Sequence, residues 1–239
     1  TTLAIAASST VDTPNATGHI VFSSTVTGAD TANQTLTKTG LGELHIQTPV
    51  ITGTVGPNLY RLDIQAGSVW IDRVSSDLGN VSLATGTTLY LNVNSSLLAG
   101  AGTITGNGRV EVRASWTLSG VNTYTGGTTV LNGATLTLGR VATMSGSTIT
   151  NSAIGTGTLT LGDATTTGTI SLGGFASLPN DITVNGTAAI TSGSTTINQV
   201  VTGVISDGVN TGKGLSFAPS STGRTMEVSN LNNSYTGAT

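Results

Sequence analysis

The fold is decided by the stretch Gly157-Thr158-Leu159-Thr160-Leu161-Gly162. Successive residues of a β-strand point to opposite faces, so Leu159 and Leu161 share a buried face while the threonines between them face water. The glycines at both ends mark turns. The stretch therefore predicts a short, half-buried strand between two turns. Similar alternation of apolar and polar residues recurs in the segments 88–94, 109–113, 135–138 and 169–172.

The apolar positions recur at a fixed step. The interval from Leu136 to Leu159 is repeated unchanged in the next three intervals between apolar positions. A sandwich of short strands gives no reason for a fixed step, whereas a solenoid needs one coil per step. We therefore predict that five side chains stack inside a rod on successive coils: Leu136, Leu159, Ile182, Ile205 and Val228.

The composition favours the same class of fold. The chain has 239 residues, of which 36% are hydrophobic and only 8% charged, with 33 glycines and no cysteine. It contains no run of about 18 apolar residues, so we expect no membrane-spanning helix. The eight lysines and arginines are scattered and the net charge is −3, which excludes the basic patch of a nucleic-acid-binding protein.

We therefore predict an all-β chain, a single right-handed parallel β-solenoid with roughly 23 residues per coil. It continues without a linker through residues 1–239. With strands ~4.8 Å apart, about ten coils would make a rod about 50 Å long.

One motif goes beyond periodicity. Leu118-Ser119-Gly120-Val121-Asn122-Thr123-Tyr124-Thr125-Gly126-Gly127-Thr128-Thr129-Val130, followed by 132–139, resembles the autotransporter-associated β-strand repeat of autotransporter passenger domains and other large bacterial surface proteins. The segment 231–239 begins a second copy, and 36–44 is similar to the lysine-glycine segment that precedes the motif in that family.

The resemblance is clearest over residues 100–239. It implies an extracellular or cell-surface location and a role as scaffold, with no catalytic residue, cofactor or metal ligand to carry over. Expected partners are neighbouring coils or domains of a longer chain, further copies of this chain, and host or matrix glycans.

The residue types of the motif indicate a structural corner. A pair such as Gly126-Gly127 permits a positive φ at a turn. Tyr124 can lay its ring on a neighbouring coil with its hydroxyl in water, and Asn122 can stack or cap backbone groups at the turn. A ligand-binding role for the motif is the alternative.

One charge cluster is a candidate catalytic site. Asp63 and Asp72 would serve as acid and base if held about 5–9 Å apart, as in enzymes that cleave polysaccharides. The alternative, which we favour, is a set of solvated ion pairs at a coil edge. The whole cluster consists of Arg61, Asp63, Asp72, Arg73 and Asp77.

Two histidines and two tryptophans are candidate ligand-binding residues. His19 and His45 are separated by close to one coil, so they can stack, but two ligands without a third make a weak metal site. Trp70 lies between Val69 and Ile71 and should face outward, where it and Trp116 would be platforms for sugars; packing roles are the alternative.

The expected function is structural and not enzymatic: a rigid stalk or adhesin passenger segment of a bacterial surface protein. A self-associating filament or biofilm-matrix module is the first alternative, and a polysaccharide-cleaving β-helical enzyme the second. Residues 226–239 carry a single charge, Glu227, and no recognisable cap. We therefore expect an interior piece of a longer protein, or a contact with another chain at this end.

Overall fold

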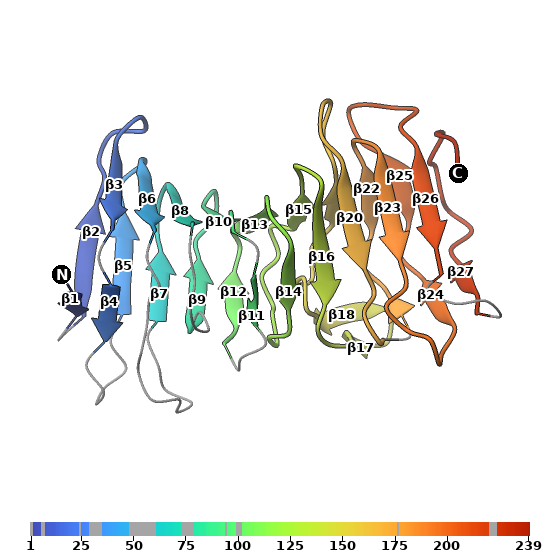
Figure 1. The fold of residues 1–239 in the computed structure, drawn as a ribbon, viewed down its shortest axis with the longest axis horizontal. Helices are drawn as coiled ribbons and strands as arrows, with labels where there is room; N and C mark the ends of the chain where they lie inside the picture. Colours follow the sequence, from blue (N-terminus) through green and yellow to red (C-terminus); the bar gives the residue numbers. More distant parts are fainter. Residues whose placement is uncertain are drawn as a thin grey trace.

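The computed structural model describes residues 2–5, 8–23, 25–28, 35–47, 61–72, 79–93, 95–98, 102–175, 177–219 and 224–239. These residues form strands and turns without a helix, so none of them belongs to a helix that could cross a membrane. Strands of successive coils pair in parallel, and the coils follow one another along the long axis from β1 to β27 (Figure 1). The predicted all-β solenoid is confirmed.

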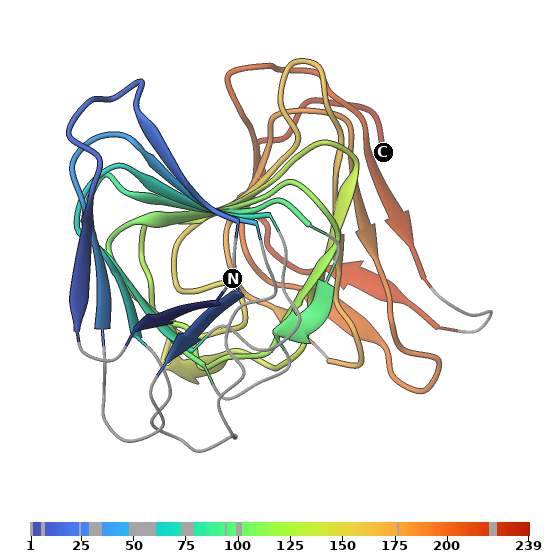
Figure 2. The same ribbon diagram turned by 60° about the vertical axis from the view of Figure 1, so that its left-hand side comes forward.

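The longest sheet runs along most of the rod and has nine strands. Its strands in spatial order are β3 (His19–Phe22), β6 (Glu43–Ile46), β8 (Ser68–Ile71), β10 (Thr88–Leu91), β13 (Arg109–Val112), β15 (Thr128–Val130), β19 (Leu159–Leu161), β22 (Ile182–Val184) and β25 (Ile205–Asp207). Figure 2 shows these coils receding behind one another.

Further parallel sheets form the other sides of the coils. The six-stranded sheet contains β11 (Ser95–Leu98), β14 (Trp116–Leu118), β16 (Ala134–Leu138), β20 (Gly168–Ser171), β23 (Ala188–Thr191) and β26 (Leu215–Ala218). The five-stranded sheet contains β2 (Ser9–Asp12), β5 (Thr35–Thr39), β7 (Arg61–Ile64), β9 (Asn80–Leu83) and β12 (Ile104–Gly106). Smaller sheets pair β21 (Ser177–Leu178), β24 (Gln199–Val201) and β27 (Met226–Val228), and β1 (Thr2–Ile5) with β4 (Thr25–Gly28).

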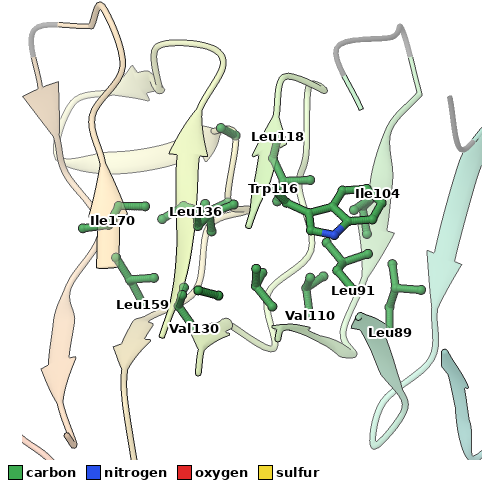
Figure 3. Packing of buried hydrophobic residues seen from close by; sticks show 14 of the residues in the cluster. Leu89, Leu91, Ile104, Val110, Trp116, Leu118, Val130, Leu136, Leu159 and Ile170 are labelled. Carbon is green, nitrogen blue, oxygen red and sulfur yellow. The ribbon is translucent and has the colours of Figure 1, made fainter. Parts of the chain in front are cut away.

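Alternation within each strand builds one continuous core. In β19 the side chains of Leu159 and Leu161 are fully buried while Thr160 between them is partly exposed. Figure 3 shows how the inner faces of two sheets meet. Side chains from the nine-stranded sheet (Leu89, Leu91, Val110, Val130, Leu159) lie opposite side chains from the six-stranded sheet (Trp116, Leu118, Leu136, Ile170).

The coils differ in length around a mean that agrees with the predicted period. In the nine-stranded sheet, the step from Val110 to Thr128 is much shorter than the next step, from Thr128 to Leu159. Averaged along this sheet from Ile20 to Ile205, successive turns are about 23 residues apart. The solenoid has about 8 turns, fewer than the sequence predicted.

The predicted column of five residues is right only in its middle. Leu159, Ile182 and Ile205 do occupy paired positions on successive coils. Leu136 lies instead on the six-stranded sheet opposite Ile170, and Val228 lies on β27 opposite Val201.

Unequal connections explain both errors. Between Leu136 and Leu159 the chain forms an extra antiparallel hairpin from β17 (Thr143–Ser145) and β18 (Thr148–Asn151). Near the other end, β25 and β26 are joined by residues 208–214, whereas β22 and β23 are joined by the shorter 185–187. A fixed step along the sequence therefore leads to a different side of the coil in each place.

One inward-facing residue is a lysine. Lys38 on β5 has no exposed surface, and its ammonium group donates to the carbonyls of Thr39 at 2.7 Å, Gly40 at 2.8 Å and Ala66 at 3.2 Å. Burial lowers the pKa of Lys38, and the charge of Asp12 opposes that shift. The three bonds satisfy the buried charge and tie the corner at 39–40 to the next coil at Ala66.

Replacing Leu159 by Asp should destabilise the chain by several kcal/mol, because it places an unpaired charge in the core. The matched control is Thr160→Asp, which puts the same charge on the outer face of the same strand. Urea unfolding of both variants measures the difference. If the two substitutions cost equal amounts, Leu159 does not face the core.

Candidate functional site

Three ring side chains from neighbouring coils stack on the outer face of the nine-stranded sheet. His45 on β6, Trp70 on β8 and Tyr90 on β10 occupy paired positions. The ring centroids of His45 and Trp70 are 5.3 Å apart with an interplanar angle of 7°, and those of Trp70 and Tyr90 are 4.0 Å apart at 21°. In-register parallel pairing brings outward-facing rings together in this way. We call His45, Trp70 and Tyr90 the aromatic ladder.

A cation lies against one end of the aromatic ladder. The Cζ atom of Arg113 is 4.9 Å from the centroid of the Trp70 ring and 5.0 Å from that of Tyr90, within the range of cation–π attraction. Its Nε atom donates to Oε1 of Glu111 at 2.5 Å, and the Glu111 carboxylate is itself largely buried. Arg113 is thereby held in place by one carboxylate and two rings.

Two carboxylates contact His45 at the other end of the aromatic ladder. His45 Nδ1 lies 2.9 Å from Asp72 Oδ2, on the following coil, and His45 Nε2 lies 3.0 Å from Glu43 Oε2, on its own strand. Asp72 also accepts from Asn92 Nδ2 at 2.9 Å. Only an imidazolium can donate from both ring nitrogens, so this geometry fits the protonated form of His45.

The surroundings of His45 raise its pKa. Burial of the ring lowers the pKa, but the hydrogen bonds and negative charges of Glu43 and Asp72 outweigh burial. The second histidine, His19, contacts the His45 ring edge-on with centroids 6.0 Å apart. The predicted proximity of the two histidines is therefore confirmed, but both nitrogens of His45 already face carboxylates. In the described part of the chain no three His, Cys, Asp or Glu side chains are arranged to hold a metal ion.

The two tryptophans have different roles. Trp70 faces outward, as the alternation predicted, but its ring is stacked between His45 and Tyr90. A sugar ring therefore has no free face of Trp70 on which to stack. Trp116 is only 2% exposed and belongs to the core, so its prediction as a sugar platform is wrong and the packing role is right. Alternation indicated this only weakly, because Trp116 opens a strand of just three residues.

The predicted acid pair is not assembled. Asp63 lies on β7 of the five-stranded sheet and accepts from Gln65 Nε2 at 2.9 Å, whereas Asp72 follows β8 of the nine-stranded sheet and binds His45. Arg61 and Asp63 form no ion pair with each other. Arg73 and Asp77 lie outside the described residues. Among the three described members of the cluster, Asp72 pairs with His45, Asp63 bonds to Gln65, and no ion pair forms between them.

The tyrosine motif forms a buried corner. Asn122 Oδ1 accepts from the backbone N of Ile104 at 2.8 Å, and Asn122 Nδ2 donates to the carbonyl of Ala153 at 2.6 Å. The incomplete second copy repeats the first of these bonds, since Asn233 Oδ1 accepts from the N of Ile205 at 2.7 Å. The predicted capping role of Asn122 is confirmed.

Tyr124 differs from the prediction. Its hydroxyl is not in water: the whole side chain is buried, and Oη pairs with Thr128 Oγ1 at 2.6 Å. Burial raises the pKa of Tyr124. The segment that follows the β17–β18 hairpin covers the ring, and Gly155 there has φ +70°, with a Cβ on it falling 2.4 Å from the carbonyl oxygen of Tyr124. Only glycine permits that approach.

Comparison with known proteins finds no match to this chain among family models, curated proteins or solved structures.

We predict that His45 stabilises the fold most at acidic pH. Its folded-state pKa is raised, so its contribution is complete below the unfolded value of about 6.5 and is lost as pH rises through the folded-state pKa. The test is the free energy of unfolding of the wild type and of His45→Gln from about pH 5 to about pH 9, with His19→Gln as control. The difference between wild type and His45→Gln should shrink as pH rises. A difference that stays constant or grows would show that the two carboxylates do not hold the proton.

Proposed function

We propose that this chain is a display scaffold, a rigid extracellular stalk or passenger segment of a bacterial surface protein of the autotransporter type. The observation that supports it most is a single core cluster extending from Leu36 to Leu215 beneath one nine-stranded parallel sheet. Eight steps at ~4.8 Å make a rod of about 40 Å whose described strands pair from one coil to the next. A rod of this kind holds an attached domain at a fixed distance from its anchor.

The motif chemistry is in keeping with this role. The polar groups of the tyrosine motif bond within the chain: Asn122 accepts a hydrogen bond from a backbone N–H, and the Tyr124 hydroxyl bonds to Thr128. The rings of the aromatic ladder likewise contact one another. These residues join coils together and hold the rod stiff, which is what a spacer requires.

The proposal predicts that the chain is exposed on intact cells of the organism that encodes it. An antibody raised against the folded chain should label unpermeabilised cells, and external protease should remove that signal while a cytoplasmic marker protein survives. Labelling that appears only after permeabilisation would contradict the proposal.

A second candidate function, lateral self-association, is favoured by the outer face of the six-stranded sheet. Its outward-facing side chains, from β14 to β26, are small and mostly hydroxylated, and none is charged: Thr117, Thr135, Thr137, Thr169, Ser171, Ala189, Thr191, Ser216 and Ala218. Charged side chains on a protein surface oppose association between copies through electrostatic repulsion. This regular uncharged face lacks that protection and would allow rods to pack side by side.

Self-association predicts larger species as concentration rises over a hundredfold range in sedimentation velocity. The double variant Thr137→Lys with Ser171→Lys should remain monomeric, because it puts like charges on the contact. The control Thr160→Lys changes the nine-stranded sheet and should associate like the wild type. A wild type that stays monomeric, or a double variant that associates equally well, would exclude this face.

A further inference from the structure

A polar groove crosses the outer face of the five-stranded sheet, away from the aromatic ladder. It has a volume of about 380 Å³ and extends over β5, β7, β9 and the start of β12. Its polar lining includes Thr35, Arg61, Asp63, Asn80, Ser82 and Thr105. Neither the scaffold role nor the corner motif uses these side chains.

Strand register arranges the lining in two columns. Thr35, Arg61 and Asn80 are paired on successive coils and form the first column. Asp63, Ser82 and Thr105 form the second in the same way. Residues of one column are ~4.8 Å apart along the rod, and the two columns are separated by two residues of strand, about 6.6 Å. The first column is centred on a cation and the second contains an anion.

The groups in these columns have bonding capacity to spare. Arg61 is exposed and, within the described residues, has neither an ion pair nor a hydrogen bond. From the described part of the chain Asp63 receives one bond, from Gln65 Nε2 to Oδ2, and Oδ1 receives none. Asn80 Oδ1 accepts from the N and the Oγ1 of Thr103 at 3.0 and 3.1 Å, so its amide NH₂ remains as an oriented donor.

This set of groups selects a class of ligand. A guanidinium binds a carboxylate through two parallel hydrogen bonds. A carboxylate such as Asp63 accepts from two neighbouring hydroxyls, and Asn80, Ser82 and Thr105 offer further donors and acceptors. We propose that this groove binds an acidic oligosaccharide, with Arg61 on the carboxylate of a uronic acid unit and Asp63 on sugar hydroxyls.

The proposal is for binding and includes no hydrolysis. Asp63 is the single carboxylate among the described residues that line the groove, and glycoside hydrolysis ordinarily uses two. The spacing between successive coils is comparable with the length of one sugar unit. A chain of sugars lying parallel to the rod axis would therefore meet polar side chains of the groove at each coil. The inference gives the scaffold a glycan-binding face and does not depend on its location in the cell.

The experiment uses two hexasaccharides that differ only in charge: hexa-galacturonate, and the same hexamer with its carboxylates reduced to alcohols. Each is titrated into the full chain by calorimetry, with amide chemical shifts of β7 and β9 as a second readout. The variants are Arg61→Gln and Asp63→Asn, and the matched control is Arg140→Gln, which removes the same charge from a partly exposed position elsewhere. Circular dichroism verifies that each variant is folded.

The proposal expects the wild type and Arg140→Gln to bind hexa-galacturonate equally. Arg61→Gln should weaken binding by about tenfold or more, and the reduced hexamer should bind the wild type more weakly by a similar factor. Asp63→Asn should weaken binding of both hexamers. No binding at millimolar ligand, an equal loss in Arg140→Gln, or shifts confined to the nine-stranded sheet would each overturn the proposal.

Discussion

The structure depends on in-register parallel pairing between successive coils. Each strand residue is paired with the residues at the same position of the coils before and after it, so a side chain has its own column as its nearest neighbours. Leu159, Ile182 and Ile205 form such a column inside the rod, and His45, Trp70 and Tyr90 form one outside. The same constraint that packs the core therefore also creates the aromatic ladder and the columns of the polar groove.

Parallel pairing fixes the register of the strands but does not fix the length of the connections between them. Coil steps in the nine-stranded sheet differ widely in length, and the extra residues leave the core register intact because they extend into turns and into the β17–β18 hairpin. Polar groups that the corners would otherwise bury are satisfied locally, by Asn122 in one corner and by Lys38 in another. Such bonds matter because an unpaired buried polar group costs about 1–3 kcal/mol.

The features that could be predicted from the sequence are those of the strands, and the features that could not are those of the connections. Alternation in strands such as 158–161 indicated the fold class, the inward leucines and the outward Trp70, because it reflects local geometry. The alternation Leu36-Thr37-Lys38 also places Lys38 inside, although its charge made that position easy to overlook.

Connection lengths could not be predicted, because turns and hairpins of different size leave the strand pattern unchanged. Leu136 and Val228 therefore lie on other sheets than the fixed step predicts, and the two candidate acids, Asp63 and Asp72, lie on separate sheets. Tyr124 was expected in water because its cover comes from a segment further along the chain, around Gly155.

The central claim is that the coils stack in one unbroken parallel register along a stiff rod. Because the chain lacks cysteine, spin labels can be attached to Val21→Cys and Ser206→Cys alone, at opposite ends of one outer column. Eight steps of ~4.8 Å predict a narrow distance distribution near about 40 Å, allowing for the label arms, in pulsed electron paramagnetic resonance. A broad distribution, or a distance well under half that value, would contradict the continuous solenoid.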